Sequence, residues 1–136
     1  MLKDLASLIL IIYIKIIVLE NKENKFNFIF YLIFNFIINS FLKIIINQDR
    51  PSNHNTNYGL LQSKGMPSGH AQLSFFTYFY LYDDKNKSLN NILLILALVI
   101  SAERIYNNKH SFLQVLIGGL IGSYLGVNLK NEIIKF

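Results

Sequence analysis

The sequence predicts an all-α integral-membrane protein, a bundle of about five transmembrane helices in a single domain over residues 1–136. Hydrophobic residues make up 52% of the chain. They gather in five apolar segments separated by polar gaps: 5–19, 26–46, 70–82, 89–106 and 111–129. This pattern favours a membrane protein, whose apolar surface contacts lipid. The alternative is a soluble helical protein with a very apolar core.

The five segments differ in how well their lengths suit a membrane. About 20 helical residues cross a hydrocarbon core of about 30 Å, so segments 26–46, 89–106 and 111–129 are long enough. Segment 70–82 is short and contains Gln72, Ser74 and Thr77, which we expect to face other helices rather than lipid. Segment 5–19 is also short. We interpret it as a retained membrane helix, because no small-residue cleavage site follows it.

The positive charges predict the orientation of the bundle. If all five segments cross, one side carries Lys22, Lys25, Lys85, Lys87, Lys130 and Lys135, and the other carries Lys3, Lys64 and Lys109. The positive-inside rule makes the first side cytoplasmic, so the long gap 47–67 and the turn at residue 110 are expected on the extracytoplasmic or lumenal face.

Composition also limits the partners and cofactors. The formal net charge is +5, but the Lys and Arg residues are scattered through the gaps instead of forming one basic face, which argues against nucleic-acid binding. The chain has no cysteines, so disulfides and thiolate metal sites are excluded.

The last apolar segment contains glycines at a spacing of four, Gly118, Gly122 and Gly126. Residues four apart lie on one face of a helix, so these glycines form a smooth strip. Such a strip predicts close packing against another helix and carries no chemistry of its own.

Basic and polar residues at the segment ends form three clusters that point to chemistry. The first joins Lys43, at the end of segment 26–46, to Arg50-Pro51, where a snorkelling lysine is the simpler interpretation of Lys43 alone. The second is Pro67-Ser68-Gly69-His70, where Ser68 is placed to cap a helix whose first amide groups could bind an anion.

The third cluster runs from Arg104 to Gln114. Arg104 and His110 would lie on different faces of one continuous helix, and Asn107-Asn108 offers the break that lets them converge. Gln114 lies one turn after His110, so its amide can hold one ring nitrogen of that imidazole. The three clusters together bring cations, imidazoles and a hydroxyl to one side of the membrane, which suits phosphoryl transfer.

The order Lys-x6-Arg-Pro, Pro-Ser-Gly-His and Arg-x5-His resembles the signature of the type 2 phosphatidic acid phosphatase superfamily, which includes vanadium haloperoxidases. The resemblance covers residues 43 to about 126. It implies that a lipid phosphate or diphosphate is hydrolysed in the membrane without metal or cofactor. It also implies two sets of roles, namely phosphate binding by Lys43, Arg50, Ser68, Gly69 and Arg104, and catalysis by His70 as acid, His110 as nucleophile and Gln114 as its partner.

This sequence departs from the family pattern at two places. Glu103 stands where the family usually has serine, and Gln114 where it usually has aspartate. If Gln114 only orients the imidazole, Gln114→Asp should maintain or raise the rate; if the pocket is built around an amide, it should lower the rate. The run Gly-Met-Pro-Ser-x-His-x-Gln, residues 65–72, resembles the dolichyl-diphosphate phosphatases and favours polyprenyl diphosphates over phosphatidate.

Two other functions compete with this interpretation. A haloperoxidase would hold vanadate with the same residues, but those enzymes are soluble and much larger. A catalytically weakened member that binds lipid phosphate, or a structural membrane protein, is the alternative outside enzymes. The oligomeric state does not follow from the sequence.

Overall fold

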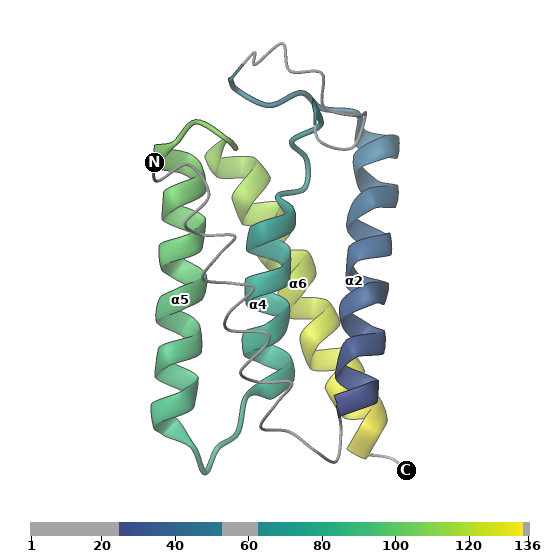
Figure 1. Ribbon diagram of the computed structural model, residues 1–136, viewed down its shortest axis with the longest axis vertical. Coiled ribbons are helices and arrows are strands. Elements are labelled where there is room, and N and C mark those ends of the chain that lie inside the picture. Colours follow the sequence, from purple (N-terminus) through teal and green to yellow (C-terminus); the bar gives the residue numbers. More distant parts are fainter. Residues whose placement is uncertain (1–24, 53–62, 135–136) are drawn as a thin grey trace.

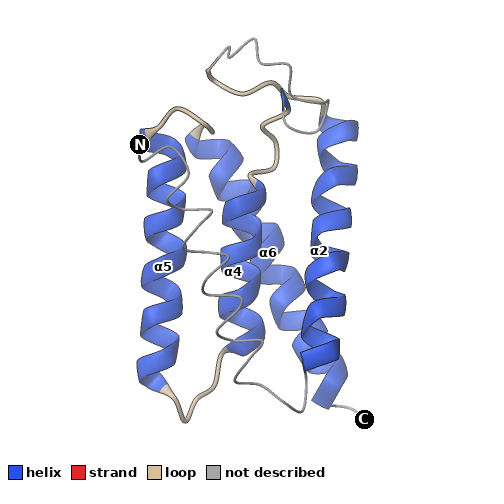
Figure 2. Ribbon diagram, viewed as in Figure 1, coloured by secondary structure: helices blue, strands red, loops and turns tan. Residues whose placement is uncertain are grey.

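The computed structural model describes residues 25–52 and 63–134, and the predicted segment 5–19 lies outside them. The described part is all-helical, with four helices: α2 (Lys25–Ile46), α4 (Gly69–Leu81), α5 (Lys87–Tyr106) and α6 (Phe112–Ile134). These four run roughly along the long axis of the molecule (Figures 1 and 2). Their bounds match the four later apolar segments, so the predicted fold class is confirmed over this part of the chain.

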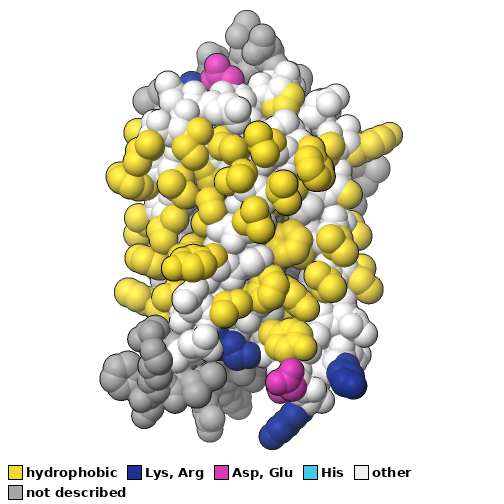
Figure 3. Space-filling view, turned by 180° about the vertical axis from the view of Figure 1, so that it is seen from behind, with side chains coloured by type: hydrophobic (Ala, Val, Ile, Leu, Met, Phe, Trp, Pro, Cys, Tyr) yellow, Lys and Arg dark blue, Asp and Glu magenta, His cyan; other side chains and the backbone are white. Residues whose placement is uncertain are grey.

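Three of the described helices are long and apolar enough to cross a membrane: Phe26–Ile46, Lys87–Tyr106 and Phe112–Asn131. They are the three segments that the sequence predicts to be long enough. Large hydrophobic side chains on α2, α5 and α6 are exposed, and hydrophobic side chains cover most of the middle of the face shown in Figure 3. This apolar face matches what the hydrocarbon region of a bilayer requires of a protein surface.

The short helix α4 is the centre of the bundle. It contacts α2, α5 and α6, and its polar residues Gln72, Ser74 and Thr77 are buried. Ser74 Oγ donates to Ala71 O at 3.1 Å and Thr77 Oγ1 donates to Leu73 O at 2.9 Å. The prediction that these residues face other helices is therefore confirmed.

The glycines of α6 bring its backbone against that of α4. A Cβ atom on Gly118 would lie 2.5 Å from Ser68 O, and one on Gly126 would lie 2.7 Å from Phe76 O. A Cβ atom on Gly122, between them, would overlap Gln72 O. Glycines four residues apart on α6 thus contact backbone positions four residues apart at the start of α4 and along it. The predicted packing strip is confirmed.

Local side chains set the ends of α5. The side chain of Asn86 caps its first turn by accepting a hydrogen bond from Leu89 N at 3.1 Å. At the same end, Asn90 exchanges two hydrogen bonds with Asp83, accepting from Asp83 N at 3.1 Å and donating to Asp83 O at 2.7 Å. The connector from α4 to α5 is therefore fixed at the end of the bundle opposite the α5–α6 turn (Figure 1).

Replacing Gly122 by valine should force α4 and α6 apart, because the new side chain meets backbone that cannot turn aside. We expect a loss of about 1–3 kcal/mol in the free energy of unfolding, measured as a lower unfolding temperature in detergent. Gly119→Val is the matched control, since the atoms nearest to a Cβ at this position belong to the side chain of Phe75 and not to backbone. Equal losses in the two variants would contradict the backbone contact.

Candidate active site

The three predicted clusters meet at one end of the bundle, where segments 47–52 and 63–68 and the α5–α6 turn lie (Figure 1). A cavity of about 380 Å³ opens there. Five of the eight predicted site residues line it: Lys43, Arg50, Gly69, His70 and His110. Residues separated by up to 67 positions in the sequence thus share one cavity.

The other three predicted residues, Ser68, Arg104 and Gln114, are buried but do not line the cavity. Ser68 N donates to Gln114 O at 3.0 Å, which ties the second cluster to the third. The pKa of Arg50 is lowered, first by the burial of Arg50 and second by the positive charge of Arg104, which therefore lies nearby. These three residues therefore lie behind the residues that line the cavity.

The chain reverses immediately after Arg104, as the Asn107-Asn108 pair predicts. Helix α5 ends at Tyr106, and Asn108 has a φ of 52°, in the left-handed region that asparagine tolerates. The backbone N–H groups of Lys109 and His110 both donate to Arg104 O, at 3.0 and 3.1 Å. This turn places His110 beside the cavity without a continuous helix.

One nitrogen of the His110 ring is held between two acceptors. Nδ1 lies 2.9 Å from Gly65 O and 3.3 Å from Gln114 Oε1. Because both partners accept, Nδ1 must carry the proton and donate. In the neutral ring Nε2 then keeps its lone pair, which is the form that a nucleophile needs.

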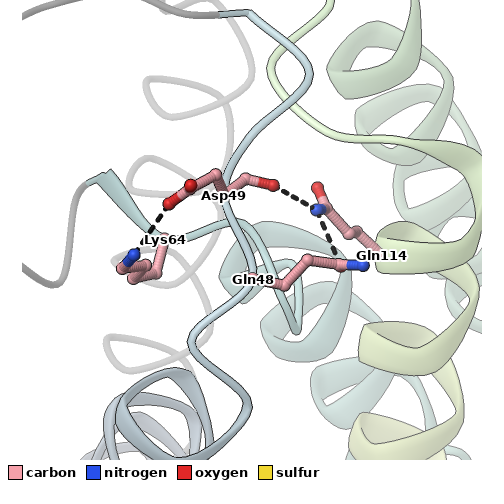
Figure 4. Close-up of polar contacts among 4 residues, drawn as sticks. All are labelled: Gln48, Asp49, Lys64 and Gln114. Atoms are coloured by element: carbon pink, nitrogen blue, oxygen red, sulfur yellow. Dashed lines mark hydrogen bonds and ion pairs between the residues drawn. The ribbon is translucent and has the colours of Figure 1, made fainter.

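The site is built around the amide of Gln114. Its Nε2 donates to Gln48 Oε1 at 3.0 Å and to Asp49 O at 2.9 Å (Figure 4). Its Oε1 is thereby turned toward His110 and also accepts from Ser111 N at 3.2 Å. A carboxylate at this position could not donate to either oxygen, so of the two sequence expectations for Gln114 the geometry favours the amide-dependent one.

Gly65 allows the loop to approach this amide. A Cβ atom on Gly65 would lie 2.5 Å from Gln114 Oε1. The same residue accepts the hydrogen bond from His110 through its carbonyl, and its N–H donates to Gln48 O at 2.8 Å. The loop between the first two clusters is therefore part of the support of His110.

The electrostatics of the cavity keep His110 uncharged. Burial first, and then the positive charges of Arg50 and Lys43, lower the pKa of His110 to about 3. The hydrogen bonds with Gln114 and Gly65 act in the opposite direction and do not reverse the shift. At neutral pH the imidazole is therefore neutral.

Two buried donors near the cavity have no hydrogen-bond partner among the described residues, Arg50 Nε and Ser68 Oγ. Ser68 occupies the N-cap position of α4, as predicted, but its side chain makes no capping hydrogen bond. Leaving such groups unpaired is costly, and Arg50 lines the cavity, so a ligand there with acceptor oxygens would stabilise its guanidinium. A phosphate group has such oxygens.

The two carboxylates that precede the site arginines in sequence have different partners. Asp49 pairs with Lys64, Oδ1 to Nζ at 2.7 Å, and not with Arg50 beside it (Figure 4). Glu103 lies 3.4 Å from Arg104, Oε2 to Nε, and its Oε1 accepts from Asn107 Nδ2 at 2.6 Å. Within residues 25–52 and 63–134, no three His, Asp or Glu side chains gather as metal ligands would.

Sequence reasoning missed two polar residues of the cavity wall, Asn35 and Asn39. With Lys43 they form a series of polar residues at a spacing of four in a mostly apolar helix. This periodicity was a usable signal, because polar residues on one face of a membrane helix point toward protein and not lipid. Gln48, which accepts from Gln114, carried no comparable signal.

Residues 24–131 match the PAP2 superfamily. The chain belongs to this superfamily. It is also 26% identical, over 144 aligned residues, to dolichyldiphosphatase 1 of Rhinolophus ferrumequinum, an alignment that covers 91% of this chain and 59% of that protein. The chain thus spans about three fifths of the length of this relative, and no solved structure is significantly similar to the chain. The resemblance to this superfamily and to its dolichyl-diphosphate phosphatase branch is confirmed.

Gln114→Glu tests whether the amide supports the site. The variant keeps the shape of the side chain but turns a carboxylate oxygen toward Asp49 O and Gln48 Oε1. We expect a loss of about 1–3 kcal/mol in the free energy of unfolding at pH 7, measured in detergent. The loss should shrink toward pH 4, because protonation of the buried carboxylate removes the charge and restores one donor. An unfolding temperature equal to wild type at pH 7 would contradict this role.

Proposed function

We propose that the chain is a membrane phosphatase that hydrolyses a lipid phosphate or diphosphate, without metal, through a phosphohistidine on His110. The observation that carries the proposal is the hydrogen bond from His110 Nδ1 to Gly65 O, at 2.9 Å. It leaves Nε2 as the reactive nitrogen of a ring that lines a cavity with Lys43 and Arg50. Membership of the PAP2 superfamily and the dolichyldiphosphatase relative support a phosphatase.

The proposed reaction has two steps. His70 takes up a proton as the anionic substrate binds among the cations. His110 Nε2 then attacks phosphorus, a nitrogen–phosphorus bond forms, and the bond to the leaving oxygen breaks while His70 donates its proton to that oxygen. His70, now neutral, accepts a proton from water, whose oxygen attacks phosphorus and releases inorganic phosphate and His110. Lys43, Arg50 and Arg104 stabilise the charge on the phosphate oxygens in both steps, with Ser68 and Gly69 beside them.

The cavity wall supports a lipid as the carrier of the phosphate. Its α2 side extends from Lys43 back to Leu32, eleven residues or about 16 Å at 1.5 Å per residue. The deeper part is lined by apolar side chains, Leu32 and Phe36 from α2 and Leu73 from α4. A phosphate among the cations would place its hydrocarbon chain along these residues. The dolichyldiphosphatase relative favours a polyprenyl diphosphate within this class.

Phosphate release should persist in EDTA and should fall at least about 1,000-fold in His110→Asn. The cavity provides cations and imidazoles instead of the carboxylates that a magnesium site needs. The assay uses detergent-purified protein with phosphatidate, lysophosphatidate, sphingosine phosphate and polyprenyl diphosphates. His110→Asn should retain part of the phosphate binding, because the three cations remain.

Two results would overturn this proposal. Activity that EDTA abolishes and Mg²⁺ restores would exclude the metal-free mechanism, and full activity in His110→Asn would exclude the phosphohistidine. Phosphate binding by the wild-type chain with no release from any of these lipids would support the competing function, a weakened member that binds lipid phosphate.

The site should face the extracytoplasmic or lumenal side. Lys85, Lys87 and Lys130 belong to the end of the bundle opposite the cavity, which the positive-inside rule assigns to the cytoplasm. Because the chain has no cysteines, Ser63→Cys and Ser88→Cys form a matched pair of exposed reporters at the two ends. An impermeant maleimide added to sealed cells or vesicles should label Ser63→Cys from the extracytoplasmic or lumenal side and Ser88→Cys from the cytoplasmic side. Labelling of Ser88→Cys from the extracytoplasmic side would reverse the orientation.

A further inference from the structure

Three buried amide side chains connect α2 to α4 next to the cavity. Gln72 Nε2 donates to Asn35 Oδ1 at 2.9 Å and to Asn35 O at 3.1 Å. Gln72 Oε1 accepts from Asn39 Nδ2 at 2.8 Å. Gln72 is fully buried, and Asn35 and Asn39 are 2% and 6% exposed. We call Asn35, Asn39 and Gln72 the amide clamp.

The clamp links the α2 side of the site, which carries Lys43, to the α4 side, which carries His70. Asn39 is one helical turn before Lys43, and Gln72 is two residues after His70. Asn39 also reaches the second cluster directly, since its Nδ2 lies 3.3 Å from Pro67 O and a Cβ atom on Gly69 would lie 3.1 Å from its Oδ1. A change in the clamp would therefore change the spacing between Lys43 and His70.

Helix α2 has few other attachments within the described chain. It contacts α4 and α6 far less than those two helices contact each other, and most of its large apolar side chains are exposed. At its other end it is held by aromatic contacts, with ring centroids of Phe28 and Tyr31 5.4 and 5.8 Å from that of Tyr80. In lipid, apolar side chains gain little by packing against each other, so hydrogen bonds have a larger share in fixing the register of such a helix.

We propose that the amide clamp is a positioning device, which fixes Lys43 on α2 at the distance from His70 on α4 that phosphate binding and proton donation require. This inference rests on the proposed function. Asn35, Asn39 and Gln72 are positioning residues in it, and they form no bond with the reacting atoms.

The test compares two leaving groups in Gln72→Leu. Loosening the clamp disturbs proton donation by His70, on which an alcohol depends and a nitrophenolate does not. A misplacement of 1 Å costs about 100-fold. We expect kcat to fall about 100-fold on phosphatidate. On nitrophenyl phosphate we expect kcat to fall by no more than about tenfold. The double variant Asn39→Gln/Gln72→Asn, which preserves the combined length of the two side chains, should recover most of the phosphatidate activity.

Asn90→Leu is the matched control for stability. Asn90 is as buried as Asn39, at 6%, and makes two hydrogen bonds at the far end of the bundle. It should lower the unfolding temperature and leave the ratio of the two activities unchanged. An equal loss on both substrates in Gln72→Leu, or the same change of ratio in Asn90→Leu, would overturn the clamp.

A binding measurement separates failure of the clamp from failure of the proposed function. Inorganic phosphate should raise the unfolding temperature of the wild-type protein, and its apparent Kd should rise about tenfold in Gln72→Leu but not in Asn90→Leu. If the wild-type protein binds phosphate without hydrolysing any lipid, the proposed function fails. The change in Kd between wild type and Gln72→Leu then still tests whether the clamp positions the phosphate-binding residues. If wild type binds no phosphate, both proposals fail.

Discussion

The close approach of α4 and α6 is the contact on which the rest of the molecule depends. Glycines at every fourth position of α6 let the two backbones meet where any side chain would separate them. At the cavity end of this contact, Ser68 N donates to Gln114 O. The serine of the second cluster and the glutamine of the third are thereby joined at one point. The separation between the two histidine-bearing segments is thus set by packing in the apolar part of the bundle.

Polar groups within the bundle form hydrogen bonds that tie separate segments together. Gln114 connects the 47–67 loop to α6, and Gln72 connects α4 to α2. Amide side chains suit both positions because each donates and accepts at once, and because they bring no charge that would need to be neutralised in an apolar setting. The buried cations, Lys43 and Arg104, lie instead at the cavity end of the bundle, where an anion can balance them. The interior therefore uses neutral groups for support and keeps its charged groups near the cavity.

The apolar segments and the glycine strip were enough to predict the helices and the α4–α6 contact, because both depend on local periodicity. The convergence of Arg104 and His110 was also predictable, since Asn107-Asn108 can reverse a chain without glycine. The partner of His110 was only half predictable. The spacing of four indicated Gln114, but the shorter contact is with Gly65 O, a backbone atom 45 residues away. No side-chain pattern encodes such a contact, because any residue supplies a carbonyl.

The same limit applies to the cavity wall. The family motifs drew attention to Lys43, while Asn35 and Asn39 carry the same spacing without a motif, and their role became visible only once Gln72 lay opposite them. Ser68 and Arg104 show the converse. Both belong to motifs and both come close to the cavity, yet their side chains lie behind its lining. Sequence order indicates which segments meet, and packing decides which atoms reach the surface.

The length of α4 links the site to the bilayer itself. Its 13 residues span about 20 Å, while the hydrocarbon core of a membrane is about 30 Å thick. Its cavity end begins well short of the corresponding ends of the longer helices (Figure 1). Under the proposed function, the phosphate of a lipid would have to descend below the level of neighbouring headgroups, or the bilayer would have to thin around the protein, before the phosphate met His70. Thinning costs a fraction of a kcal/mol for each ångström, so membrane thickness would become a variable that acts on substrate access.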